Sequence, residues 1–289
     1  MAFPNVIIAG APKSGTSSLF FWLAAHPDVC GSRIKETYFL HDKISKHNQT
    51  LNYISNGFEA YEKCFPDFNG EKIIIEATAP YIYQETPLKV IPRLPEKPKI
   101  IFILRNPAER IYSHFKFNKY RMNNMPKAMN FEEYIKVRGK GLNMEDYIDH
   151  SNYDKYINKY IDVVGLENVK VYLFEDLVSD KVKFMKMVAL DLGLDDTFYN
   201  NFDFFKRNET VNIKRKWLHD LGLKLEPWFP QILQEKVFIP LYLKLNGSKV
   251  PQKTSEEKVE IKKLKNFFTP YNESLKQKFP YLNIEIWND

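Results

Sequence analysis

Residues 9–19 combine small residues, hydroxyl side chains and a single lysine in the order AGAPKSGTSSL. They follow a short apolar run and precede a segment with helical periodicity. A loop that leads into a helix leaves several backbone N–H groups without helical partners, and the positive end of the helix dipole favours negative charge beside them. Lys13 adds a mobile cation, and Thr16, Ser17 and Ser18 add hydroxyl donors. The segment is therefore predicted to bind an anion such as a phosphate group.

The position of the lysine separates this loop from the nucleotide-binding motif that it approaches. A P-loop reads GxxxxGK[ST]; Gly10 and Gly15 have the required separation, but Thr16 stands where the lysine belongs, and Lys13 comes three places earlier. A kinase or nucleotidase that uses Mg²⁺ is therefore a weaker hypothesis, although the strand, loop and helix permit it. A helix that Ser and Thr merely cap, with no ligand, is the simplest alternative.

A second candidate element begins at Arg105, in the sequence RNPAERIYS. Asn106 suits the N-cap, Pro107 the first helical position and Glu109 the third, as in a capping box, so a helix is predicted to start here. Arg105 then lies at the carboxyl end of an apolar run, the edge at which open α/β sheets bind ligands. Ser113 follows about two turns into the helix. Taken alone, each residue is explained by a surface ion pair or an ordinary helix position.

Four short apolar runs are predicted to form a buried parallel sheet, because β-branched and aromatic residues dominate them and longer helical segments separate them. They are residues 6–9, 73–75, 100–104 and 169–174. These runs favour an α/β fold with a P-loop-like central parallel sheet flanked by helices. We expect a single domain over residues 1–289, with a helical C-terminal part from about residue 200.

Helix signals lie between these runs. Helical spacing of apolar residues predicts a helix over residues 19–24, which stops at His26-Pro27, and another over residues 181–192, which ends at Gly193. The stretch from residue 85 to residue 98 contains four prolines and cannot be one uninterrupted helix. It predicts a short helix and an irregular lead into the third strand.

Together, the two candidate elements resemble those of the sulfotransferase family, which transfers a sulfuryl group from 3′-phosphoadenosine 5′-phosphosulfate (PAPS) and releases adenosine 3′,5′-bisphosphate (PAP). Residues 12–19 resemble its loop for the 5′-phosphosulfate, and the segment from Arg105 to Ser113 resembles its 3′-phosphate site. Residues 34–39, IKETYF, are similar to the KExxxF segment of heparan-sulfate, NodH-like and bacterial carbohydrate sulfotransferases. Tyr153, residues 174–177 and residues 267–272 resemble the same branch.

The resemblance implies a role for each matching residue. Lys13 is expected to stabilise the leaving oxygen of the 5′-phosphate, and Glu36 to take the proton of the acceptor hydroxyl, with His41 and His114 as alternative bases. The donor site is expected to comprise Lys13, Ser14, Gly15, Thr16, Ser17, Ser18, Arg105 and Ser113, with Lys214 and Arg215 of the basic segment 207–216 closing over the 3′-phosphate. No metal is required.

Two departures from the heparan-sulfate enzymes bear on the acceptor. Ala77 replaces the lysine of an EKTP-like segment, and His41 stands where an acidic residue is expected, with Asp42 next to it. Both favour a small molecule, a secondary metabolite or an uncharged carbohydrate over a polyanionic glycan. Transfer to an amine in place of a hydroxyl stays open, and so does the oligomeric state.

The overall composition argues against several other classes. The chain has 289 residues, 44% of them hydrophobic, and its 42 Lys and Arg against 36 Asp and Glu give a net charge of +6. This surplus is mild, and without a recognised motif an anion- or nucleic-acid-binding module is a weaker alternative. Two cysteines without metal-site spacing favour a reducing compartment, and the apolar runs are too short to cross a membrane. A first strand at residue 6 leaves no room for an anchor, so we expect a soluble, cytoplasmic enzyme of bacterial type without metal, membrane or nucleic-acid partners.

Overall fold

The computed structural model describes residues 2–122, 125–126, 128–137, 146–205, 212–213, 245–248 and 250–288. The chain divides into two compact units, which we describe separately. The first comprises Met1–Pro107, Asn152–Arg207 and Phe267–Asp289, and the second comprises Ala108–Ser151 and Asn208–Asn266. A single domain over residues 1–289 stays a prediction.

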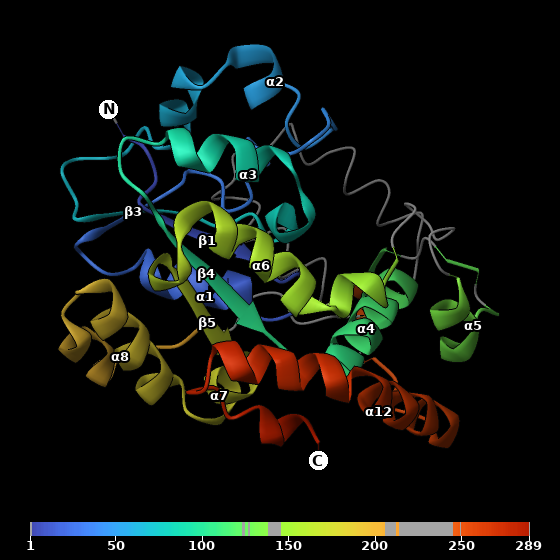
Figure 1. Ribbon diagram of the computed structural model, residues 1–289. Helices are drawn as coiled ribbons and strands as arrows, with labels where there is room; N and C mark the ends of the chain where they lie inside the picture. The colour runs from blue at the N-terminus through green and yellow to red at the C-terminus, as the bar shows by residue number, and fades with distance from the viewer. Residues whose placement is uncertain are drawn as a thin grey trace. The chain divides into compact units, whose positions relative to one another are not determined.

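The first unit is built on a parallel sheet of five strands in the order β2-β3-β1-β4-β5 (Figure 1). The strands are β1 (Val6–Gly10), β2 (Val29–Gly31), β3 (Ile73–Glu76), β4 (Lys99–Leu104) and β5 (Val169–Leu173). Strand β1 pairs with both β3 and β4, so that Val6 lies opposite Ile75 and Lys99. The four predicted strands are confirmed, whereas β2 went unpredicted because three residues are too few for a periodicity signal.

Short helices connect these strands. The α-helices that lie wholly in the first unit are α1 (Thr16–Leu23), α2 (Tyr53–Asn56), α3 (Thr86–Val90), α6 (Tyr153–Val164), α7 (Phe174–Ser179) and α8 (Lys181–Leu192). Its 3₁₀ segments are η1 (Glu59–Cys64), η2 (Ala79–Tyr83), η3 (Ile91–Arg93), η6 (Leu166–Asn168), η7 (Asp196–Asn201) and η10 (Ile284–Trp287). The two predicted helices correspond to α1 and α8, and α8 ends at Gly193 in the left-handed conformation, with φ 68°. The proline-rich stretch forms α3 and η3, as predicted.

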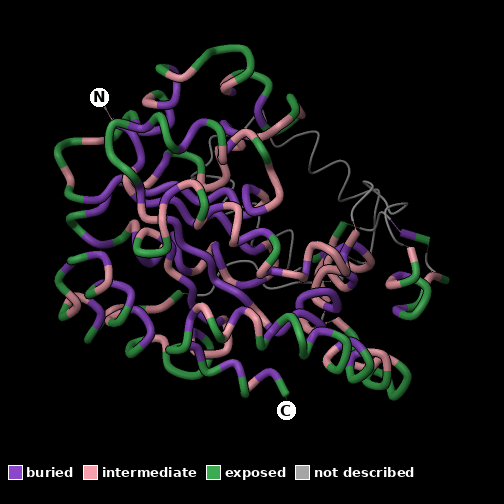
Figure 2. Tube along the Cα trace, in the orientation of Figure 1, coloured by how far each residue is buried: buried purple, intermediate pink, exposed green. Residues whose placement is uncertain are grey.

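Both faces of the sheet are buried, which explains why its strands read as continuous apolar runs. Alternate residues of each strand enter different cores: Ile7 and Phe102 belong to one cluster, and Ile8 and Ile103 to the other. Helix α6 contributes side chains to the first cluster, and α1 and α8 contribute to the second. Figure 2 shows the buried residues concentrated along the strands. This rigid sheet fixes the positions of the loops that follow its carboxyl ends.

The second unit is mainly helical in its described residues. Its elements are α4 (Pro107–Lys116), which starts at the last residue of the first unit, the π-helical η4 (Phe117–Met122), α5 (Phe131–Lys136), η5 (Asp149–Ser151), and the strands β6 (Asn212–Ile213) and β7 (Gly247–Ser248). The buried guanidinium of Arg110 donates to Ser151 Oγ at 2.6 Å and to the Tyr147 carbonyl at 3.1 Å.

Helix α12 (Ser255–Lys278) starts in the second unit and ends in the first, and it confirms a helical C-terminal part. The antiparallel pairing of β6 with β7 went unpredicted, because each strand has only two residues. No helix in the described part of the chain is long and apolar enough to cross a membrane.

Candidate functional site

The loop after β1 enters α1 through two residues in left-handed conformations. It runs from Ala11 into the first turn of α1, and we call residues 11–18 the anion loop. Lys13 and Gly15 both take left-handed conformations, with φ 70° and 94°, and Gly15 forms the N-cap of α1. A Cβ on Gly15 would lie 2.9 Å from Cδ2 of Phe174. Only glycine fits there, because it tolerates the positive φ and leaves room for the ring.

The anion loop is anchored to the sheet and carries a buried hydroxyl with no partner. The Ala11 amide donates to the Ile103 carbonyl of β4 at 2.9 Å, and the Ser14 amide donates to the Ala11 carbonyl at 3.3 Å. The Ser14 side chain is 0% exposed, and its Oγ has no hydrogen-bond partner among the described residues. Buried hydroxyls are nearly always satisfied, so the orphan Ser14 Oγ fits a bound oxyanion. Ser17 and Ser18 lie half-buried in the first turn of α1.

Glu36 lies beside the anion loop, joined to it by Lys35. The Lys35 ammonium donates to Glu36 Oε1 at 2.8 Å and to Thr16 Oγ1 at 3.4 Å. The Lys35 side chain is only 10% exposed and that of Glu36 is 33% exposed, so the pair is not a solvated surface contact. A carboxylate and the first residue of α1 thus share one ammonium group.

Tyr38 contacts the second oxygen of Glu36. Its hydroxyl donates to Oε2 at 2.9 Å, and burial together with the charge of Glu36 raises the pKa of Tyr38. The ring stacks on His47, with centroids 5.0 Å apart and an interplanar angle of 22°. His41 contacts the same ring at 5.7 Å, and its Nδ1 faces the Lys43 backbone amide at 3.4 Å. His41 therefore packs against the Tyr38 ring.

A buried carboxyl group lies beneath this segment. Glu76, the last residue of β3, is 0% exposed, and burial raises its pKa. Its Oε1 contacts the hydroxyls of Thr37 at 2.5 Å and Thr78 at 2.7 Å, and its Oε2 contacts the Tyr61 hydroxyl. Because Thr37 separates Glu36 from Tyr38, this cluster fixes the backbone on which the Glu36 side chain is carried. Ala77 is fully buried in the same strand end.

Arg105 follows the carboxyl end of β4, where it was expected. Its guanidinium lies over the Phe174 ring, 4.9 Å from the centroid, and its carbonyl accepts from the Tyr153 hydroxyl at 2.8 Å. The Asn106 amide donates to Glu175 Oε1 at 3.0 Å. Tyr153 and Glu175 belong to two of the three later matches to the family, and here they contact the backbone at the end of β4. Phe174 touches both Arg105 and Gly15, so one ring lines both predicted donor-binding elements.

The remaining predicted residues lie on α4 in the second unit or outside the described residues. Ser113 and His114 are half-buried on α4 in the second unit, where the His114 ring packs edge-on against Tyr147 at 5.0 Å. Lys214 and Arg215 lie outside the described residues. Lys13, Ser14, Gly15 and Thr16 lie in one loop of the first unit, and Lys35 joins Glu36 to Thr16 of that loop. Lys35, Tyr38 and Phe174 contact these candidate elements, although the sequence patterns did not single them out as site residues.

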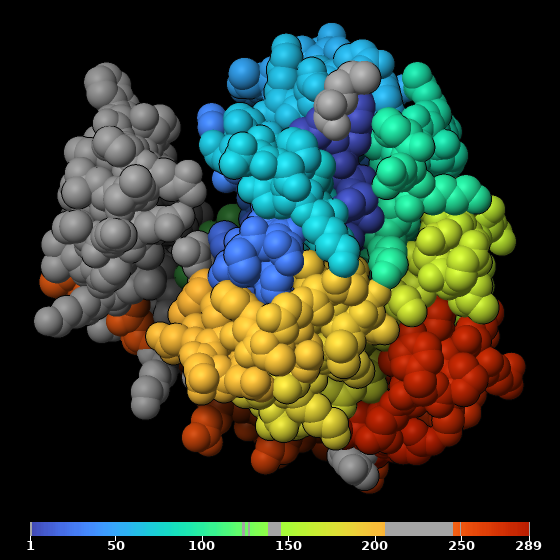
Figure 3. All heavy atoms as spheres, turned by 90° about the vertical axis from the view of Figure 1, so that its left-hand side faces the viewer, coloured from blue at the N-terminus to red at the C-terminus, as the bar shows by residue number. Residues whose placement is uncertain are grey.

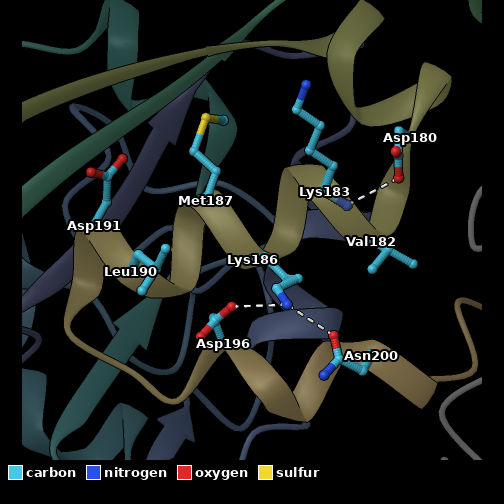
Figure 4. Close-up of a pocket in the computed structure, with 9 residues that line it drawn as sticks. All are labelled: Asp180, Val182, Lys183, Lys186, Met187, Leu190, Asp191, Asp196 and Asn200. Carbon is cyan, nitrogen blue, oxygen red and sulfur yellow. Dashed lines mark hydrogen bonds and ion pairs between the residues drawn. The ribbon is translucent and has the colours of Figure 1, made fainter.

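A surface hollow is lined by residues of α8 and η7 in the first unit, and the atoms of these elements appear in gold in Figure 3. Figure 4 shows its lining: Asp180, Val182, Lys183, Lys186, Met187, Leu190, Asp191, Asp196 and Asn200. The Lys186 ammonium is engaged by Asp196 at 3.1 Å and by Asn200 at 2.9 Å. None of the predicted site residues lines this hollow.

Comparison with known proteins identifies the family. Residues 3–221 match the family model described as the sulfotransferase domain. This chain belongs to the sulfotransferase family. The sulfotransferase is similar to the solved structure of a sulfotransferase from Alicyclobacillus acidocaldarius, with a TM-score of 0.61 and 25% identity, over 78% of this chain and 93% of that chain. It is an enzyme of the transferase class.

Curated relatives are similar over shorter stretches. The sulfotransferase is 31% identical over 121 residues to the membrane-associated sulfotransferase kil1 of Dictyostelium discoideum, which is 41% of this chain and 24% of that protein. It is 24% identical over 203 residues to the human bifunctional heparan sulfate N-deacetylase/N-sulfotransferase 1, which is 68% of this chain and 22% of that protein. The match thus spans less than a quarter of these relatives' length. Among the residues that the structure describes, no cluster of His, Cys, Asp and Glu could hold a metal ion.

Proposed function

We propose that this sulfotransferase transfers a sulfuryl group from PAPS to a hydroxyl group of its acceptor and releases PAP. The observation that carries the proposal is the position of Lys35, whose ammonium contacts both Thr16 of the anion loop and the Glu36 carboxylate. One side chain thus joins an anion site to a group that can accept a proton. Transfer from an anionic donor to a hydroxyl needs both within reach of the same atoms.

The anion loop is proposed to bind the 5′-phosphosulfate end of the donor. The buried Ser14 hydroxyl supports this assignment, because an unsatisfied buried hydroxyl costs about 1–3 kcal/mol and an oxyanion would relieve it. The hydroxyls of Thr16, Ser17 and Ser18 stand at the start of α1, where the dipole favours negative charge. Arg105 is proposed to hold the 3′-phosphate; Ser113, Lys214 and Arg215 stay predictions from the family resemblance.

The chemical step then divides between Lys13 and Glu36. As the acceptor oxygen forms its bond to sulfur, Glu36 takes the hydroxyl proton. As the bond between sulfur and the bridging oxygen breaks, Lys13 stabilises the negative charge that grows on the 5′-phosphate. His41 and His114 stay alternative bases, and the transfer requires no metal.

The acceptor is proposed to be small or uncharged, such as a secondary metabolite or a neutral carbohydrate. Ala77 supports this view, because it is buried and adds no cation to the strand end. Transfer to an amine is the alternative, since relatives include heparan sulfate N-sulfotransferases. The two cysteines are buried and unpaired, which favours a reducing, cytoplasmic location.

Two variants separate chemistry from donor binding. Turnover of radiolabelled PAPS is measured over a panel of free sugars, simple alcohols, phenols and primary amines, and PAP binding is measured by calorimetry. Glu36→Gln is expected to lower turnover about 10²–10⁴-fold without changing the Kd of PAP. Lys13→Ala is expected to lower turnover about 10²–10³-fold. Lys89→Ala, at an exposed lysine on α3, is the control.

Several outcomes would contradict the proposal. Full turnover in Glu36→Gln would move the base to His41 or His114, and full turnover in Lys13→Ala would remove its role at the leaving group. Turnover with amines alone would establish N-sulfation. Binding of ATP–Mg²⁺ without binding of PAP would favour the P-loop kinase alternative.

A further inference from the structure

The phenol of Tyr38 occupies one oxygen of the carboxylate that we propose as the general base. Its hydroxyl donates to Glu36 Oε2 at 2.9 Å, while Lys35 donates to Oε1 at 2.8 Å. We infer that Tyr38 is a positioning residue, which holds the Glu36 carboxylate so that its unused lone pairs face the acceptor hydroxyl. This inference rests on the proposed role of Glu36 and names a residue that neither the sequence motifs nor the comparisons assign.

The backbone of Tyr38 is held in a conformation that a tyrosine rarely adopts. Its φ is 51°, in the left-handed region. This conformation costs free energy for any residue that has a Cβ, so it persists only where the surrounding contacts hold it. The Tyr38 amide donates to Thr78 Oγ1 at 3.3 Å, and the buried Asn48 side chain donates to the Tyr38 carbonyl at 3.0 Å. Two contacts from different segments thus fix the residue that reaches Glu36.

The side chain is held as firmly as the backbone. The ring stacks on His47 and also contacts His41. Burial and the neighbouring Glu36 raise the pKa of Tyr38, so the phenol stays protonated and can only donate to the carboxylate. The Lys35 ammonium contacts Glu36. Burial, Lys46 and His41 lower the pKa of His47 against the opposing charge of Glu36, which leaves that ring neutral at neutral pH.

This arrangement leaves the carboxylate able to act. Each carboxylate oxygen has two lone-pair sites, so one donor on each oxygen leaves a second site for a substrate proton. With both oxygens tethered, the plane of the carboxylate is fixed before the acceptor binds. A base that is already fixed loses less conformational entropy when the transition state forms. This preorganisation is the contribution that we assign to Tyr38.

Tyr38→Phe tests the inference, because it removes the hydroxyl and keeps the ring that stacks on His47. Turnover is measured with radiolabelled PAPS and the best acceptor of the panel above, or with water as acceptor if no panel compound is sulfated. The kcat is expected to fall about tenfold, as for loss of a hydrogen bond to a charged group, with an unchanged Kd for PAP. The acidic limb of the pH profile of kcat should move to higher pH, because the charged carboxylate loses a donor.

A matched control and a double variant exclude a merely structural effect. Tyr53→Phe removes a hydroxyl that accepts from Arg93 Nη1 at 2.8 Å, and it should leave turnover and the pH profile unchanged. In the Glu36→Gln background, Tyr38→Phe should cause little further loss, because the two residues act together. Tyr38→His retains a ring and a donor nitrogen, so it should restore part of the turnover and also serves if Tyr38→Phe folds poorly.

The outcomes separate this inference from the proposed function. Full turnover in Glu36→Gln would overturn both the base and its positioning residue. Loss in Glu36→Gln with full turnover and an unmoved acidic limb in Tyr38→Phe would overturn only the role of Tyr38. An equal loss from Tyr38→Phe in both backgrounds would also overturn it, since the effect would not pass through Glu36.

Discussion

The guanidinium of Arg105 lies 4.9 Å from the centroid of the Phe174 ring. The same ring leaves no space for a side chain at Gly15. Phe174 therefore contacts the anion loop, which follows β1, and Arg105, which follows the neighbouring strand β4. The ring sets the spacing between the anion loop and the end of β4. A cation over an aromatic face is held by the ring quadrupole, so the position of Arg105 depends on this ring.

Gly15→Ala is expected to weaken PAP binding about tenfold. The added Cβ would lie 2.9 Å from Phe174 Cδ2, and alanine at φ 94° is strained. A left-handed conformation costs an L-residue about 1–2 kcal/mol. Calorimetry measures the Kd, and Gly15→Ala with Phe174→Leu should recover only the part due to the collision.

Gly57→Ala is the control for this prediction. Gly57 also has a positive φ, 74°, but nothing lies within 4 Å of its would-be Cβ. Its variant should lose stability and keep the affinity for PAP. If both alanine variants bind PAP as the parent protein does, the shape of the anion loop does not matter for the donor.

Arg105→Lys is expected to raise the Kd of PAP about tenfold or more, because lysine keeps the charge and loses the bidentate fork. The comparison ligand is adenosine 5′-monophosphate, which lacks the 3′-phosphate. Its affinity should change little in the same variant, if Arg105 contacts the 3′-phosphate.

Arg93→Lys provides a matched control, since the Arg93 guanidinium also lies over a phenylalanine ring, that of Phe58, at 5.3 Å. It should leave both affinities unchanged. An equal loss of affinity for the two nucleotides in Arg105→Lys would show that Arg105 does not recognise the 3′-phosphate.

Glu76→Gln is expected to become more stable, relative to the parent protein, as the pH rises. Burial raises the pKa of Glu76 in the folded state above its unfolded value. The stability that this group contributes is therefore fully present below the unfolded pKa, about 4.3 for glutamate, and is lost as the pH rises through the folded pKa. The glutamine variant has no titratable group at this position, so it does not lose this stability as the pH rises.

Thermal melts between about pH 4 and about pH 8 measure the difference between the two proteins. Glu59→Gln, at an exposed glutamate on η1, controls for the change of charge. A difference in melting temperature that shifts in favour of the parent protein with rising pH would mean that the three hydroxyls stabilise a charged Glu76.

The local features of this site could be predicted from the sequence. Buried parallel strands produce continuous apolar runs, and a glycine-rich loop between such a run and a helix identifies the anion loop. The carboxyl end of β4, with Arg105, follows from the same logic. These features depend only on residues that are neighbours along the chain.

The contacts that join distant segments could not be predicted in this way. The adjacent Lys35 and Glu36 give no sign in the sequence of a distant partner, yet Lys35 contacts Thr16, 19 residues away, and is 10% exposed. Phe174 ends an apolar run, but periodicity does not reveal that β5 pairs with β4 and brings its ring to Arg105. The hydrogen bond from Tyr38 to Glu36 depends on the left-handed backbone conformation of Tyr38, which the sequence does not predict.

A residue of the proposed site or its support lies at or beyond the carboxyl end of every strand of the sheet. Lys13 follows β1, Glu36 follows β2, Glu76 ends β3, Arg105 follows β4 and Phe174 follows β5. The proposed binding surface therefore draws on the carboxyl ends of all five strands, so it requires the complete sheet. A ligand that binds only the complete sheet stabilises all of it at once, so bound nucleotide should slow hydrogen exchange of amides in all five strands together, including the three-residue β2.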